Sequence, residues 1–126
     1  RDAYCHEVGN SKDYSFCLTT FIQILANPEL YDGKRVLVYG WANETQGVVA
    51  LFPSIDSMDS AELNSSILIE RRDVDAYVGL EQVLQSSKDH RRRVQVGGVL
   101  HVNWPTREGA GRGPRFAKIT QLEEFQ

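Results

Sequence analysis

The sequence contains few of the residues that usually carry catalytic or metal chemistry. Its 126 residues include only two cysteines and three histidines, and no P-loop, GxSxG, HExxH or EF-hand pattern occurs. No apolar run approaches the roughly 20 residues that a membrane-spanning helix needs. Apolar residues make up 41% and charged residues 25% of the chain, which excludes a collagen-like chain, low-complexity disorder and a disulfide-dense mini-protein. One globular domain with one core is therefore expected.

The charge balance is slightly acidic. Fourteen basic residues stand against 17 acidic residues, which gives a formal net charge of −3. Proteins that mainly bind phosphate backbones are usually basic. The composition therefore disfavours, without excluding, a role devoted to nucleic acid.

The two cysteines lie close together near the start of the chain. Cys5 and Cys17 are separated by a polar segment, His6–Phe16, that we expect to be irregular. A disulfide between them would tether that segment, although two unrelated thiols are the alternative. The chain also begins without methionine, as it would after removal of a signal peptide, but a shortened chain would begin in the same way. We expect a periplasmic or secreted protein, with a cytoplasmic location as the alternative.

The hydrophobic pattern divides the chain into an N-terminal extension and a barrel domain. Residues 1–17 are the expected extension, and residues 18–126 are the expected domain with its preceding helix. Residues 18–31 have helical spacing, with Thr19 or Thr20 as N-cap and an interruption at Asn27-Pro28. A second helix is expected over residues 74–87, and residues 53–64 and 105–114 are expected to be loops. Period-two or β-branched runs predict five strands, at Lys34–Trp41, Gly47–Phe52, Ser65–Glu70, Arg91–Asn103 and Arg115–Leu122.

The order of these elements predicts the fold class. Five short strands, with a helix between the third and the fourth, are typical of the OB-fold, a five-stranded Greek-key barrel. Gly40 and the pair Gly97-Gly98 lie inside the first and fourth strands, where a strand that bends around a barrel needs a bulge or kink. We therefore expect a mainly β protein with two helices, built as an OB-like barrel.

Residues 24–40 carry a resemblance to a known family. They read Ile-Leu-Ala-Asn-Pro-Glu-Leu-Tyr-Asp-Gly-Lys-Arg-Val-Leu-Val-Tyr-Gly. This run resembles a family of small bacterial proteins with the pattern N-P-x-x-Y-D-G-K-x-V-x-V-x-G, and residues 117–123 are similar to the end of that family's chains. The resemblance implies an OB-fold and an exported location. It brings no catalytic residues to carry over.

Nothing in the sequence assembles a catalytic or metal site. His6, His90 and His101 fall on three different predicted elements, so they show none of the convergence that a metal site needs. Cys17 has no assigned base, and a disulfide partner is available to it. We therefore expect no catalytic residues, no metal and no cofactor.

Aromatic residues and arginines supply the candidate binding surface. OB-folds bind ligands on the face of their second and third strands and with the loops that join strands one and two and strands four and five. Aromatic rings there can stack, and arginines are frequent at interface hot spots. In the alternative interpretation, the aromatics close the barrel and the arginines pair with Asp73, Asp75 or Asp89. The candidate residues are Tyr39, Trp41, Phe52, Trp104, Arg107, Arg112 and Arg115, with Arg91-Arg92-Arg93 opening the fourth strand.

Two functions are compatible with these features. The first is a non-enzymatic exported module that binds another protein, for example as an immunity or inhibitor-type protein, and the acidic surface would suit a basic partner. The second is the binding of single-stranded nucleic acid through the same groove. The second hypothesis predicts a steep loss of affinity with salt.

Overall fold

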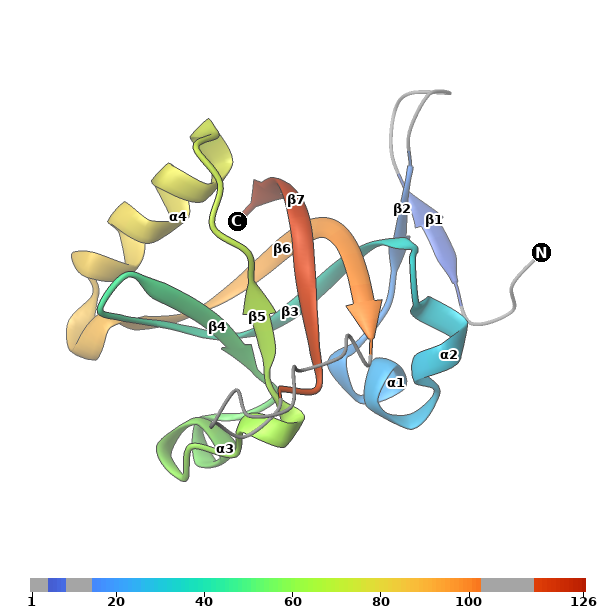
Figure 1. Cartoon of the computed structure of the whole chain (residues 1–126), viewed down its shortest axis with the longest axis horizontal. Helices are drawn as coiled ribbons and strands as arrows, with labels where there is room; N and C mark the ends of the chain where they lie inside the picture. The colour runs from blue at the N-terminus through green and yellow to red at the C-terminus, as the bar shows by residue number, and fades with distance from the viewer. Residues whose placement is uncertain (1–4, 9–14, 103–114) are drawn as a thin grey trace, which may run out of the picture.

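The computed structural model describes residues 5–8, 15–102 and 115–126 (Figure 1). The strands in these ranges are β1 (His6–Val8), β2 (Phe16–Leu18), β3 (Arg35–Thr45), β4 (Val48–Phe52), β5 (Ile67–Ile69), β6 (Arg91–Val102) and β7 (Ala117–Phe125). The α-helices are α1 (Phe21–Ala26), α2 (Pro28–Tyr31), α3 (Ile55–Asp59) and α4 (Asp75–Gln85). Single 3₁₀ turns occur at Leu63–Ser65 and Lys88–His90. The loop expected over residues 105–114 lies outside the described residues.

Five of the strands close into a barrel. Strand β3 pairs with β4, β4 with β5, β5 with β7 and β7 with β6, and β6 returns to pair with β3. All of these pairs are antiparallel except β5–β7. The OB-like barrel predicted from the order of elements is confirmed, with β3 to β7 as its five strands. The last strand begins two residues later than expected and continues to Phe125.

The first barrel strand is longer than the sequence pattern predicted. We expected a turn at Asn43–Gln46, but β3 continues to Thr45, and only Gln46 and Gly47 form the turn. Both of these residues have positive φ, 53° and 82°, as a two-residue hairpin turn requires. The longer strand places Asn43 and Thr45 beside β4, which matters for the site described below.

The two expected glycine positions differ in how they shape the barrel. The pairing of β6 with β7 shifts register between Gly97 and Val99, so the bulge expected there is confirmed. A Cβ atom on Gly98 would lie 2.6 Å from Ile119 Cγ2 and 2.9 Å from the backbone oxygen of Thr120. At Gly40 the pairing with Val94 is regular, so no bulge occurs there. Gly40 instead leaves room for Leu51, whose Cγ would lie 2.6 Å from an added Cβ.

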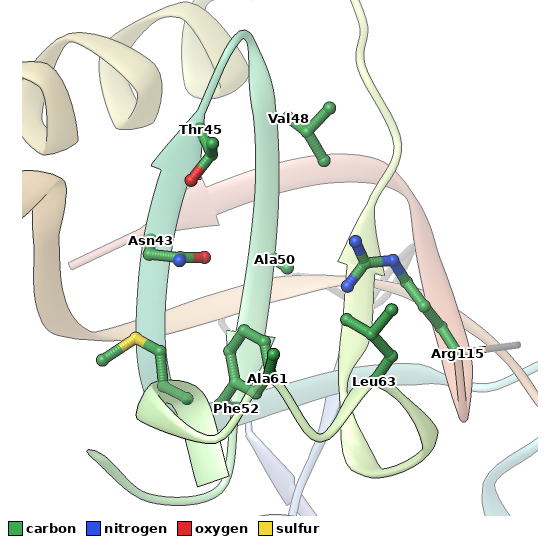
Figure 2. Close-up of a pocket in the computed structure, with 9 residues that line it drawn as sticks. Asn43, Thr45, Val48, Ala50, Phe52, Ala61, Leu63 and Arg115 are labelled. Atoms are coloured by element: carbon green, nitrogen blue, oxygen red, sulfur yellow. The ribbon is translucent and has the colours of Figure 1, made fainter. Parts of the chain in front are cut away.

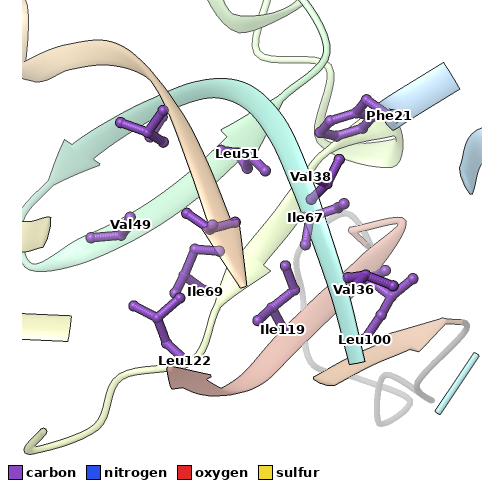
Figure 3. Close-up of a cluster of buried hydrophobic side chains, with 14 of the residues drawn as sticks. Phe21, Val36, Val38, Val49, Leu51, Ile67, Ile69, Leu100, Ile119 and Leu122 are labelled. Carbon is purple, nitrogen blue, oxygen red and sulfur yellow. The ribbon is translucent and has the colours of Figure 1, made fainter. Parts of the chain in front are cut away.

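Alternate residues of the barrel strands fill one core. Val36 and Val38 of β3, Val49 and Leu51 of β4, and Ile119 of β7 are fully buried, and Figure 3 shows their side chains converging inside the barrel. Helix α4, expected from the helical spacing of residues 74–87, adds Tyr77, Leu80 and Leu84 to the same cluster. Val78, which contributed to that spacing, is instead 40% exposed. The period-two pattern thus directs one face of each strand inward and leaves the other face to line the outside.

The N-terminal segment contains a hairpin in addition to the expected helix. Strands β1 and β2 pair antiparallel, β2 pairs in parallel with β3, and the expected Cys5–Cys17 disulfide joins the hairpin. The prediction of an irregular segment up to Phe16 and of a helix from residue 18 was therefore wrong at these strands. Strand β2 forms because Phe16 and Cys17 are buried against the barrel. The helix starts at Phe21, where the Thr20 side chain accepts a hydrogen bond from the Gln23 amide.

Two further expectations concern helices. The interruption at Asn27-Pro28 is confirmed, because α1 ends at Ala26 and α2 begins at Pro28. The segment 53–64, expected to be a loop, contains α3. A capping box between Ser54 and Ser57 satisfies the first amides of this short helix.

Candidate binding groove

A groove lies on the outer face of the barrel, over β3 and β4 and beside α3 (Figure 2). Its volume is about 310 Å³. Most of its lining is apolar, and among the lining residues that the structure describes, Arg115 is the only charged one. The groove is lined by Asn43, Thr45, Val48, Ala50, Phe52, Met58, Ala61, Leu63 and Arg115.

The floor of the groove follows from the alternation of β4. Val49 and Leu51 point into the core, so Val48, Ala50 and Phe52 face outward. Cross-strand pairing sets Asn43 of β3 opposite Ala50. The result is an apolar strip along β4 with polar side chains from β3 at its edge.

Helix α3 closes one end of this strip. Met58 buries itself against Ala50 and Phe52. The partly buried side chains of Trp41, Ile55 and Leu63 pack against the same small cluster. This second apolar cluster lies outside the barrel, so α3 covers part of the outer face and leaves the remainder open as the groove.

Arg115 enters the groove from the segment that leads into β7. Its Nη1 donates a hydrogen bond of 3.0 Å to Ser66 Oγ, and Figure 2 shows its guanidinium beside Leu63. Ser66 is fully buried, and its backbone oxygen accepts the amide of Phe116 at 3.0 Å. Burial lowers the pKa of Arg115 from its usual value, but an arginine remains charged at neutral pH. The groove therefore holds a partly desolvated positive charge.

Phe52 and Arg115 are the two predicted binding residues that line the groove. Trp41 packs on the adjoining apolar cluster, which is nearer to the alternative interpretation of the aromatics as packing residues. Trp104, Arg107 and Arg112 lie outside the described residues.

Tyr39 lies farther along the outer face of β3 and does not line the groove. It is 44% exposed, and the guanidinium carbon of Arg93 lies 4.7 Å from its ring centroid. The suggested pairing of arginines with Asp73, Asp75 or Asp89 is not seen for Arg91, which instead pairs with Asp59 of α3 at 2.5 Å.

The sequence analysis missed several groove residues. Asn43 and Thr45 were assigned to a turn or its border, and Met58, Ala61 and Leu63 to a loop. The signal that could have identified α3 is Ser54 followed three residues later by Ser57, with Ile55 and Met58 at helical spacing. Both serines hydrogen-bond locally, which is typical of a helix start.

Ionisable groups elsewhere make structural contacts. Glu44 is buried at the β3–β4 turn, where it accepts the Gly47 amide at 2.8 Å and lies 3.2 Å from His90 Nδ1. The Gly47 amide lowers the pKa of Glu44, assisted by His90, although desolvation opposes the shift. His101 Nε2 lies 3.0 Å from Thr120 Oγ1. Within the three described ranges, no group of three or more His, Cys, Asp or Glu side chains could hold a metal ion.

Together, the closed barrel and the outer groove define an OB-like module with a surface depression beside its second strand. No protein-family model, no curated protein and no solved structure matched the chain. Among the helices of the described ranges, none has the length and apolar character to cross a membrane.

Proposed function

We propose that this chain is a non-enzymatic, exported binding module that recognises another protein through the groove. The observation that carries the proposal is an apolar depression on the barrel's outer face, where Arg115 is the only charged residue among the described lining residues. Interface hot spots are enriched in arginine and in large aromatic residues. An immunity or inhibitor-type protein is one form of such a module. The proposal includes membership of the bacterial family that residues 24–40 resemble.

The groove's construction supports recognition of a peptide segment. Val48 forms part of the floor and is 44% exposed, so apolar surface remains for a partner to cover. Ala50 and Phe52 are held by the core strand that they share with Leu51. A rigid floor reduces the entropy that ordering would cost on binding.

The proposed location is supported by the cysteines. Both cysteines form the Cys5–Cys17 disulfide, and disulfides persist chiefly in oxidising compartments. We therefore propose a periplasmic or secreted protein.

Affinity capture with two matched variants tests the proposal. The full chain is immobilised and exposed to native extract at near-physiological salt. One half of the extract is treated with nuclease beforehand and the other half is not. We expect one stoichiometric protein to be captured in both halves. Val48→Lys, which places a charge on the groove floor, should abolish capture. Val78→Lys should not, because Val78 is similarly exposed, at 40%, on α4 away from the groove.

Single-stranded nucleic acid is the second candidate, and one observation favours it. Tyr39 is exposed with Arg93 over its ring, and such pairs can stack bases. If all captured material disappears on nuclease treatment, the protein-binding proposal fails and the nucleic-acid proposal replaces it. Capture that survives Val48→Lys would also refute binding through the groove.

A further inference from the structure

Arg115 is the electrostatic centre of the groove. Within the described ranges it is the only charged residue that lines the groove. None of the salt bridges formed within the described ranges involves Arg115. A guanidinium has five N–H donors, and the hydrogen bond to Ser66 is the only one that Arg115 makes to a described residue. The remaining donors are available to an acceptor in the groove.

Ser66 positions this guanidinium. Its hydroxyl accepts from Arg115 and donates to the backbone oxygen of Leu63 at 2.8 Å. Its own backbone oxygen accepts the Phe116 amide. Arg115 is thus fixed both at its main chain, through the neighbouring residue, and at one end of its side chain. Such an ordered guanidinium is suited to a bidentate pair with a carboxylate, whose geometry matches its remaining donors.

The apolar floor runs along the strand beside this charge. Val48, Ala50 and Phe52 are successive outward residues of β4, so the strip is about 14 Å long at about 3.4 Å per residue. About four residues of an extended chain have this length. Val48 is 44% exposed, whereas Ala50 and Phe52 are 3% and 4% exposed where Met58 packs on them. Ala50 presents only a methyl group, and Leu63 lies across from it beside Arg115 (Figure 2). The position next to the charge is therefore suited to an aliphatic side chain.

From this arrangement we infer that the groove binds an extended segment of the partner protein in which an acidic side chain pairs with Arg115 and a neighbouring aliphatic side chain packs on Ala50 and Leu63. This inference rests on the proposed function and specifies its ligand. The chain's net charge of −3 does not oppose it, because the acidic side chains of the described ranges lie outside the groove lining. A partner can therefore be basic overall and still present an acidic side chain at this point.

Capped tetrapeptides test the inference directly. Acetyl-Val-Glu-Leu-Val-amide carries one charge, on the glutamate side chain, and acetyl-Val-Gln-Leu-Val-amide is its neutral control. Each is titrated into the ¹⁵N-labelled full chain, and the amide shifts of Ala50 and Leu63 are followed. We expect the glutamate peptide to bind at least about tenfold more tightly, because a charge-assisted bidentate contact is lost in the control. Equal affinity for the two peptides, or no binding of either, would overturn the inference.

Variants assign the preference to Arg115. Arg115→Gln should remove the difference between the peptides, and Arg115→Lys should restore part of it, because lysine offers a point charge without the bidentate geometry. Arg93→Gln is the matched control, since Arg93 is an exposed arginine outside the groove. A glutamate preference that persists in Arg115→Gln would refute the assignment. Thermal unfolding of each variant confirms that it is folded.

The outcomes separate this inference from the proposed function. If the captured protein is lost with Val48→Lys but retained by Arg115→Gln with unchanged affinity, groove binding stands and the acidic ligand is wrong. If capture survives Val48→Lys, the proposed function itself is wrong. Binding of the oligonucleotide (dT)₈ at the same amides, weakened by salt, would replace both with nucleic-acid binding.

Discussion

Reduction of the Cys5–Cys17 disulfide should destabilise the whole barrel. The bond joins residues 12 apart in sequence. In the chain-entropy model, closing a loop of this size stabilises the folded state by about 3 kcal/mol, because the unfolded chain loses conformations. The chain has only these two cysteines, so a reductant changes no other covalent bond. The perturbation therefore needs no substitution in the core.

The full effect is expected only if the hairpin unfolds together with the barrel. Phe16 and Cys17 are 3% and 5% exposed, and the Phe16 ring lies over Gly97 of β6. Arg35 of β3 places its guanidinium carbon 5.0 Å from the centroid of the same ring. Opening the hairpin would expose this part of the core. We therefore expect the hairpin to belong to the cooperative unit of the barrel.

Urea unfolding of the oxidised and reduced protein, followed by circular dichroism, measures the effect. The reduced protein should have a free energy of unfolding lower by about 3 kcal/mol and a Tm lower by about 10 °C. Cys5→Ser under oxidising conditions should unfold like the reduced wild type. Free energies that agree within about 0.5 kcal/mol would refute the argument, because the hairpin would then open independently of the barrel.

Two further predictions concern the barrel. Gly98→Ala should lower the free energy of unfolding by about 2–3 kcal/mol in urea titration, because the new Cβ meets the fixed oxygen of Thr120 at 2.9 Å. Gly33→Ala has open space around it, so it should lower the free energy of unfolding only by the cost of a left-handed backbone, about 1 kcal/mol. Equal decreases in the two variants would contradict the steric explanation. Folding lowers the pKa of Glu44, so its stabilising effect is present above the ordinary glutamate pKa and is lost as the pH falls through the pKa of the folded state. Glu44→Gln should therefore weaken the dependence of the free energy of unfolding on pH below about pH 5. An unchanged pH dependence would exclude this contribution.

The barrel could be predicted because its strands follow a local pattern. The period of two in β3 and β4, and the helical period of α4, depend only on neighbouring residues. Strand β2 was missed because three residues, Phe16–Leu18, are too short to display a period, and they become a strand by pairing with β1 and β3. Helix α3 was missed because its five residues are mostly polar and its stability depends on the Ser54 cap and on packing against Phe52.

The groove was predictable only in part, for a related reason. Phe52 was identified by its aromatic ring and Arg115 by its charge, and both line the groove. Their neighbour Asn43 lies on β3, paired with β4, and Leu63 lies in the 3₁₀ turn before β5. No spacing in the sequence records that meeting, because the pairing of β5 with β7 is what brings Arg115 to the groove. The make-up of the groove therefore depends on tertiary structure, whereas the fold class depends largely on local pattern.

Core residues and groove residues alternate along a single strand. In β4, Leu51 is fully buried in the barrel, whereas Val48 is exposed and belongs to the groove. Adjacent residues of a strand face opposite sides, so a change at one of these positions acts on the core and a change at the other acts on the outer surface. Ala50 shares features with both residues. It lines the groove as Val48 does, but it is only 3% exposed because α3 covers it. A substitution at Val48 should therefore change the groove without altering the packing that closes the barrel.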